Sequence, residues 1–242
     1  KEKGYIVIDS KDGQKIKKVW VKIMPILDKN DKKQVERYIE FLNNSEYTRL
    51  TQSLEWGRVK KDWKQEAVYL EENGNIIAAM TILLEKVPKM KYYLMYCSRG
   101  PVCKSDDVET IKKLVKEAEP LAKKYNAFCL KLDPQLEYSK EINRLFIQNG
   151  FKTSGEKADH DKLIQPLYEA VLDIDNISEE ELIKKFSEKT RYNIRLSKRK
   201  GIEVYYSRSE EDLKIFYELY KITCKRDKIG RRAYEYFKGM LD

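Results

Sequence analysis

Three strand-like runs follow one another in the first half of the chain, and their order restricts how this part can fold. The runs cover residues 67–71, 76–84 and 91–97, and the dipeptide Asn73-Gly74 between the first two is a strong signal for a β-hairpin. Strands joined by so short a turn pair antiparallel. The pattern therefore predicts a sheet built from neighbouring strands.

Helical and strand-like segments alternate around these runs. Residues 31–43 carry an apolar stripe at helical spacing, and a helix over residues 106–125 is expected to bend at Pro120. Further helices are predicted for residues 53–61 and 139–148, and further strands for residues 5–9, 18–27, 127–132 and a stretch from Phe151. From residue 24 on, the order β-α-α-β-β-β-α-β-α-β is similar to that of acyl-CoA N-acyltransferase-like (GNAT) folds, which bind acyl donors against a splayed central sheet.

The second half of the chain begins a similar series. After a polar connector at residues 155–162, strands are predicted at 169–174 and 202–206, and helices at 179–187, 189–200, 209–226 and 233–240. The sequence ends before a sheet, which would leave Phe216, Tyr220 and Phe237 without a facing layer. We therefore expect a second domain that is incomplete at its C-terminus; the alternative is that these helices pack on the first domain.

The expected fold class is α/β (α+β), with tandem GNAT-like domains and mixed central sheets. The expected division is an N-terminal hairpin extension at residues 1–23, a first GNAT-like domain at 24–165 and the start of a second at 166–242.

The chain is basic, with a net charge of +9 and a pI near 9.1, which favours RNA, a nucleotide or an anionic membrane surface as a partner. Six of the twelve residues from 189 to 200 are basic and none is acidic. Arg191, Arg195 and the pair Lys198/Arg199 fall about one helical turn apart, so they share a face. Such a face either meets phosphates or is an ordinary solvated basic surface.

The sequence lacks the residues that several classes of catalytic chemistry need. His160 is the only histidine, which disfavours serine, cysteine and zinc hydrolases that depend on histidine partners. The four cysteines form no CxxC pair, and neither a Walker A motif nor a glycine-rich dinucleotide loop occurs. We expect no metal and no cofactor. Without a signal-like N-terminus or a run of about 18 apolar residues, a cytosolic protein with reduced thiols is expected.

Five stretches, in register over residues 24–242, resemble the Fem (FemABX) family of aminoacyl-tRNA-dependent peptidoglycan peptidyltransferases. They cover residues 50–60, 96–102, 130–134, 189–201 and 232–237. The resemblance implies two GNAT-like domains that move an aminoacyl group from aminoacyl-tRNA to the stem-peptide amine of UDP-MurNAc-pentapeptide or lipid II. It also implies a cytoplasmic location, with peripheral contact at the inner membrane face as a further expectation.

The resemblance further implies that Lys60 and Arg232 hold the diphosphate of the acceptor. A lysine point charge and a planar guanidinium from two domains can clamp a diphosphate. The alternative is an exposed lysine beside Trp63 and an arginine that merely begins a helix, and Arg231 competes with Arg232 for the role.

Four more residues match positions of the family's acceptor site. Tyr96 and Tyr236 would line the acceptor pocket, although both could be core tyrosines. Arg99 could meet an anion at a strand end, and Asp133 could orient the acceptor amine; Gly100-Pro101 and Asp133-Pro134 also read as plain turns.

The basic helix would then dock tRNA phosphates or anionic lipid headgroups through Lys189, Arg191, Arg195, Lys198 and Arg199. Two other functions remain open at this point. A CoA-dependent N-acetyltransferase needs a backbone pyrophosphate loop, and residues 100–106 hold one glycine. A non-catalytic module could use the same helix to bind RNA or an anionic surface.

Overall fold

The computed structural model describes residues 5–6, 19–20, 25–154, 165–166 and 170–241. The chain divides into two compact units, Lys1–Lys157 and Ala158–Asp242, and each is described by itself. At the start of the first unit, β1 (Tyr5–Ile6) pairs antiparallel with β2 (Val19–Trp20). This confirms the predicted N-terminal hairpin where it is described; its remaining residues lie outside the described ranges.

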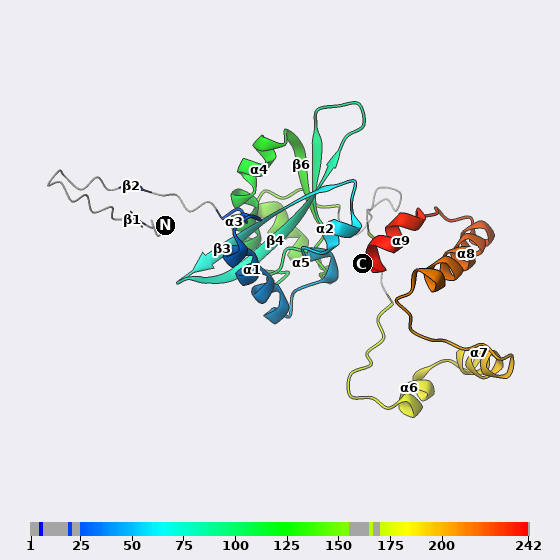
Figure 1. Ribbon diagram of the computed structural model, residues 1–242. Helices are drawn as coiled ribbons and strands as arrows, with labels where there is room; N and C mark the ends of the chain where they lie inside the picture. The colour runs from blue at the N-terminus through cyan, green and yellow to red at the C-terminus, as the bar shows by residue number, and fades with distance from the viewer. Residues whose placement is uncertain (1–4, 7–18, 21–24, 155–164, 167–169, 242) are drawn as a thin grey trace. The chain divides into compact units, whose positions relative to one another are not determined.

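A mixed sheet forms the centre of the first unit (Figure 1). In the described part of the chain it has four strands in the order β3-β4-β5-β6, antiparallel except for the parallel pair β5 and β6. Asn73 and Gly74 take φ values of 51° and 81°, the left-handed conformation that a two-residue hairpin turn requires. The predicted strands are confirmed as β3 (Lys64–Glu72), β4 (Asn75–Lys86), β5 (Tyr93–Cys97) and β6 (Ala127–Leu132).

Helices cover both faces of this sheet. On one face α1 (Lys32–Asn44), capped by Asp31, buries Tyr38 and Leu42 against Ala67 and Ala79. The other face packs α3 (Val108–Glu117), α4 (Glu119–Lys124) and α5 (Lys140–Gln148) on a core that includes the fully buried Met80, Ile82 and Leu84. The break between α3 and α4 falls at Ala118, where Pro120 cannot continue the hydrogen-bond ladder.

Two local predictions in the first unit are wrong. Instead of a helix over 53–61, the chain forms a 3-10 turn, η1 (Leu50–Gln52), and a four-residue helix, α2 (Trp56–Val59). Residues 25–27 form no strand, and Ile26 makes one bridge to Val68 of β3; residue 24 lies outside the described ranges. The neighbouring Pro25 has no N–H and contributes only its carbonyl, to Tyr69 N at 2.9 Å.

Within its described residues the second unit contains four helices and no strand. The predicted helices are confirmed as α6 (Glu179–Lys185), α7 (Glu188–Arg199), α8 (Glu210–Asp227) and α9 (Tyr234–Leu241). Ser178 and Glu181 form a capping box at the start of α6, and aromatic rings of Phe216, Tyr220 and Phe237 pack between α8 and α9.

The predicted strands at 169–174 and 202–206 are wrong where they can be judged. Residues 170–174 and 202–206 contain no strand, and Val171 is 83% and Val204 90% exposed. Apolar alternation favours a strand only when a neighbouring strand accepts its backbone hydrogen bonds, and these segments have none among the described residues.

Candidate functional site

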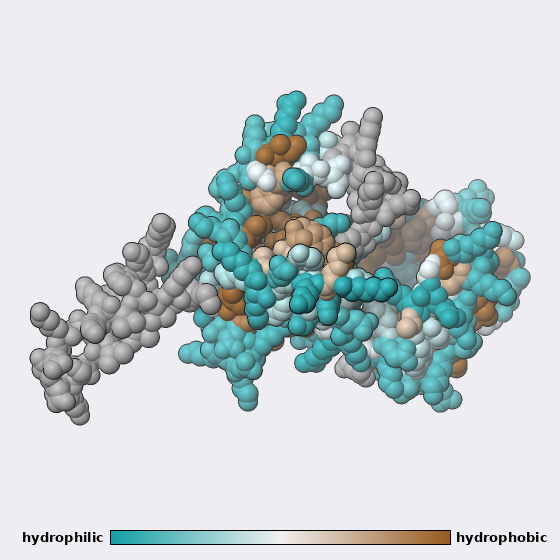
Figure 2. All heavy atoms as spheres, turned by 90° about the horizontal axis from the view of Figure 1, so that it is seen from above, coloured by the Kyte–Doolittle hydropathy of each residue, from teal (hydrophilic) through white to brown (hydrophobic). Residues whose placement is uncertain are grey.

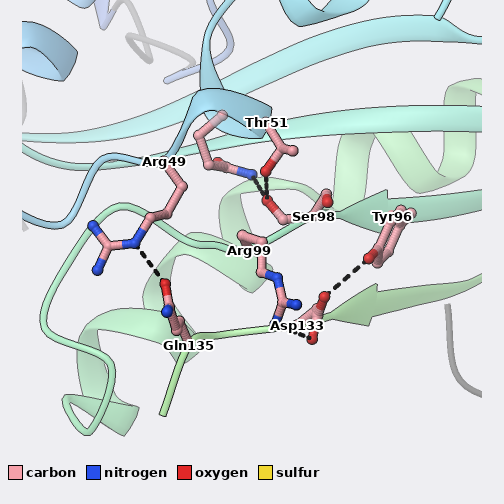
Figure 3. Close-up of polar contacts among 8 residues, drawn as sticks. Arg49, Thr51, Tyr96, Ser98, Arg99, Asp133 and Gln135 are labelled. Carbon is pink, nitrogen blue, oxygen red and sulfur yellow. Dashed lines mark hydrogen bonds and ion pairs between the residues drawn. The ribbon is translucent and has the colours of Figure 1, made fainter. Parts of the chain in front are cut away.

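Three of the predicted site residues meet where the parallel strands β5 and β6 end. The phenol of Tyr96 donates a hydrogen bond of 3.0 Å to Oδ2 of Asp133, and Nη1 of Arg99 lies 3.9 Å from Oδ1 (Figure 3). Cys97 pairs with Leu132 in the ladder, so the residues that follow the two strands emerge at the same edge. This cluster of Tyr96, Arg99 and Asp133 is called the carboxylate site below.

The carboxylate site is partly shielded from water. The side chains of Arg99 and Asp133 are 16% and 27% exposed, and Arg99 takes a left-handed φ of 50° at the end of β5. Both carboxylate oxygens face a donor, the phenol of Tyr96 and the guanidinium of Arg99. A carboxylate has about four acceptor sites, so one such group can accept from several N–H donors at once. A carboxylate held in this way can orient an amine.

A buried glutamine fixes the strand end that carries this cluster. Gln52 is fully buried; its Nε2 donates to the carbonyl of Ser98 at 2.7 Å, and its Oε1 accepts from Thr81 N at 2.9 Å. Thr51 Oγ1 donates a second hydrogen bond, of 2.8 Å, to the same carbonyl. A Cβ on Gly100 would lie 2.5 Å from Cδ of Gln52, so only glycine fits there. Gln52 was not predicted as a site residue, because a glutamine in a polar turn carries no local signal of burial.

A second polar link joins the segments beside the carboxylate site. Arg49 Nε donates to Oε1 of Gln135 at 2.7 Å (Figure 3). Arg49 Nη1 donates to the carbonyls of Glu46 and Thr48 at 3.0 Å. The link ties the turn before η1 to the segment after β6. Neither Arg49 nor Gln135 was predicted as a site residue.

Lys60 lies directly after α2. Its backbone closes the helix by donating to the carbonyl of Trp56 at 3.1 Å, and its ammonium lies 5.9 Å from the ring centroid of Trp63. Lys60 thus lies beside the ring of Trp63. The alternative interpretation, a lysine that only lies next to this ring, predicts the same position.

Arg232 and Tyr236 lie together in the second unit. The guanidinium lies 5.0 Å from the ring centroid of Tyr236, a cation–π contact. The backbone of Arg232 is fixed on both sides: its N–H donates to the phenol of Tyr220 at 3.0 Å, and its carbonyl accepts from the phenol of Tyr217 at 3.0 Å. Lys60 belongs to the other unit. The binding of one diphosphate by both Lys60 and Arg232 therefore remains a prediction.

The basic helix is confirmed as α7. One of its cationic side chains, that of Arg191, forms hydrogen bonds within the protein. Arg191 Nη1 donates to the carbonyls of Phe186 and Lys184, where it satisfies the C-terminal end of α6. The other four predicted residues are exposed, and they are Lys189, Arg195, Lys198 and Arg199. Their contact with an anion remains a prediction.

The buried cysteines beside the site are unsuited to covalent catalysis. Burial raises the pKa of the Cys97 thiol far above its usual range and that of Cys103 to about 12. A thiol must ionise to act as a nucleophile, so neither supplies a thiolate near neutral pH. In the described residues no cluster of histidine, cysteine or acidic side chains is placed to hold a metal. No helix there has the length and apolar character to cross a bilayer.

Comparisons with known proteins agree with the fold. Residues 34–242 match the family model of the FemAB family. The chain is 36% identical over 222 residues to the UDP-N-acetylmuramoylpentapeptide-lysine N(6)-alanyltransferase of Weissella viridescens, covering 90% of this chain and 66% of that protein. It is 35% identical over 198 residues to the lipid II:glycine glycyltransferase of Staphylococcus haemolyticus, covering 80% and 47%.

A crystal structure of FemX superposes with a TM-score of 0.68 at 27% sequence identity, over 86% of this chain and 52% of that one. The chain thus spans about half to two thirds of the length of the relatives that it matches.

Proposed function

Because the chain belongs to the FemAB family, we propose that it acts in moving an aminoacyl group from charged tRNA to the stem-peptide amine of a peptidoglycan precursor. The product would be the interpeptide bridge. The two relatives named above are an alanyltransferase for the lysine of UDP-N-acetylmuramoylpentapeptide and a glycyltransferase for lipid II, so the acceptor is proposed to be one of these precursors. We place the reaction in the cytoplasm, with a peripheral site at the inner membrane face.

The carboxylate site is the observation that best supports this proposal. An acceptor lysine has an ordinary pKa near 10.4 and reaches the site as an ammonium. Asp133, held by Tyr96 and Arg99, can accept one of its N–H bonds and aim the nitrogen at the donor. In this role Asp133 positions the nucleophile.

The transfer itself is balanced without a further reactant. The deprotonated amine attacks the carbonyl carbon of the aminoacyl ester, a C–N bond forms, and the C–O bond to the tRNA ribose breaks. The ammonium first gives up one proton to the solvent, and the second proton lost by the nitrogen ends on the ribose oxygen, to which the neighbouring tRNA hydroxyl can relay it. Since an amide replaces an ester, the reaction is downhill and depends mainly on positioning and oxyanion stabilisation.

Binding of the acceptor diphosphate is assigned to Lys60 and Arg232, with residues 24–165 and 166–242 as the two contributing GNAT-like domains. Stacking on Tyr236 and the two tyrosine contacts to its backbone hold Arg232 in one conformation before binding, which lowers the entropy that binding must overcome.

The proposed function is tested by incubating the protein with charged tRNA and either UDP-MurNAc-pentapeptide or lipid II, followed by mass spectrometry of the stem peptide. The expected result is a peptide heavier by one or more aminoacyl residues, only when the tRNA is charged. Consumption of acetyl-CoA without tRNA would instead indicate an N-acetyltransferase, and tRNA binding without turnover would indicate a non-catalytic module.

The Asp133→Asn variant is expected to transfer about 10- to 100-fold more slowly at saturating charged tRNA, because it loses a charge-assisted hydrogen bond of roughly 1.5–3 kcal/mol to the ammonium. If Asp133 positions the amine, raising the pH should recover part of the rate in Asp133→Asn, since the neutral amine no longer needs a carboxylate. Asp173→Asn, an exposed carboxylate in the second unit, is the control. A wild-type rate in Asp133→Asn would contradict the assignment.

The exposed cations of α7 are proposed to contact tRNA phosphates. Replacing Arg195, Lys198 and Arg199 by glutamine should weaken tRNA binding and reduce the slope of log affinity against log salt by about 2. The matched control removes three exposed lysines of the first unit, Lys32, Lys33 and Lys116. Filter binding at several salt concentrations measures both quantities, and an unchanged slope in the α7 variant would remove this surface from the proposal.

A further inference from the structure

The strands β4 and β5 are joined by a hairpin (Figure 1, the teal loop at the top) whose turn carries exposed apolar side chains. The side chains of Met90 and Tyr92 are 55% and 47% exposed. The backbone of the turn is hydrogen-bonded: Val87 N donates to the carbonyl of Tyr92 at 2.9 Å, and Met90 N donates to the carbonyl of Val87 at 3.1 Å. The backbone is therefore fixed while the side chains stay in water. Residues 88–92 are all exposed and are called the hairpin tip below.

Lys89 occupies a backbone conformation that favours glycine. Its φ is 61°, and Pro88 precedes it, as at the two central positions of a type II turn. Glycine would adopt this conformation without strain, whereas lysine is strained there. Lysine makes the backbone of this turn less favourable than glycine would. Its presence at the apex therefore suggests that the lysine side chain has a function.

Positive charge surrounds the exposed apolar side chains. Lys86, Lys89 and Lys91 lie on the hairpin without an acid between residues 86 and 93. The end of α4 joins them, since Asn126 Nδ2 donates to the carbonyl of Lys91 at 3.4 Å. That end carries the exposed Lys123 and Lys124, the latter paired with Glu66 at 2.9 Å; the other nearby acids are Glu85 at the base of the hairpin and Glu119 on α4.

The apolar part of this surface continues onto the edge strand of the described sheet. Phe128 of β6 is 60% exposed and lies beside the position where Tyr93 pairs with Ala127, at the base of the hairpin. Viewed from above, hydrophobic side chains on the molecule lie among long hydrophilic ones (Figure 2). An exposed apolar tip within a ring of lysines is the composition of proteins that bind at a membrane interface.

We propose that the hairpin tip docks on the surface of an anionic phospholipid bilayer. Met90 and Tyr92 enter the headgroup region, while Lys86, Lys89 and Lys91 pair with lipid phosphates. Methionine and proline at the apex favour lipid over nucleic acid, because contacts to a phosphate backbone need neither. The inference rests on the peripheral membrane site of the proposed function and adds the surface that makes the contact; bilayer binding can be measured without transfer.

The test is co-sedimentation of the protein with vesicles of phosphatidylcholine alone or with 30% phosphatidylglycerol. Binding is expected on the anionic vesicles only and should fall with added salt. Lys89→Gln/Lys91→Gln should lower partitioning on the order of 20-fold, because each lysine near an anionic surface contributes about fivefold. Met90→Ser/Tyr92→Ser should lower it about tenfold through lost apolar burial.

Matched controls separate the hairpin from general charge and apolar exposure. Lys32→Gln/Lys33→Gln removes the same charge from α1, and Ile77→Ser/Ile147→Ser removes two exposed apolar side chains outside the tip, on β4 and α5. Both should partition like the unaltered protein. Equal partitioning of the hairpin variants and the unaltered protein would overturn the proposal, as would failure of the unaltered protein to bind anionic vesicles.

Two further measurements distinguish this proposal from the others. Hairpin variants that lose tRNA binding while retaining vesicle binding would show a nucleic-acid surface and overturn the lipid assignment. Transfer to the soluble acceptor UDP-MurNAc-pentapeptide should be unchanged in the hairpin variants. A failed transfer reaction in the unaltered protein would count against the proposed function, whereas vesicle binding would still decide this inference.

Discussion

Replacing Lys60 and Arg232 together by alanine is expected to weaken binding of UDP-MurNAc-pentapeptide by roughly 10²- to 10⁴-fold. Each substitution removes a charge-assisted contact to the diphosphate worth about 1.5–3 kcal/mol, and the two losses add if both side chains touch the same group. Titration calorimetry of the single and double variants measures the affinity directly and requires no turnover.

Neighbouring residues provide a matched control for this prediction. Lys61 and Arg231 are both exposed, carry the same charges and are adjacent in sequence to the proposed pair. The Lys61→Ala/Arg231→Ala variant should bind the acceptor within about a factor of five, since only general electrostatic attraction is lost. Unchanged affinity in Lys60→Ala/Arg232→Ala would reject the diphosphate assignment, and a large loss in Arg231→Ala alone would transfer the role to that arginine.

Replacing the buried Gln52 by leucine is expected to destabilise the first unit by about 3–5 kcal/mol. Leucine has a similar volume but leaves Thr81 N without its acceptor and removes one of the two donors to the Ser98 carbonyl, and an unsatisfied buried group costs about 1–3 kcal/mol. Misfit of the branched side chain against Gly100 adds to the loss.

Urea denaturation followed by circular dichroism measures the change in the free energy of unfolding. The control is Gln148→Leu on the exposed side of α5, for which a change within about 0.5 kcal/mol is expected. A loss below about 1 kcal/mol in Gln52→Leu would mean that Gln52 does not fix the end of β5. Amide exchange at Thr81 provides an independent readout of the lost hydrogen bond.

Local pattern was sufficient to predict most of the first unit. Asn-Gly located the β3–β4 turn and Pro120 the break after α3, because each of these signals acts within a few residues. The segment at 202–206 shows the opposite case. Its apolar alternation satisfies the local rule for a strand, but a strand also needs a partner, and the partner is not a local property.

The carboxylate site was only partly predictable. Tyr96 and Asp133 were selected through family resemblance, and nothing in their local sequence indicates that phenol and carboxylate touch. The support beneath them depends on contacts between residues far apart in sequence, such as Gln52 with Thr81 and Ser98. Likewise, Arg191 has the same helical spacing as Arg195, and only the structure shows that it is committed to the end of α6.

The contrast between Gln52 and the Arg49–Gln135 pair bears on how enzymes of this kind could be re-engineered. Gln52 is enclosed, so changing it would disturb the scaffold before it altered selectivity. Arg49 and Gln135 meet at the surface through one hydrogen bond, and neither sits in the packed interior. Libraries that diversify this pair while leaving the glutamine untouched would vary the surface beside the carboxylate site with little loss of folded protein.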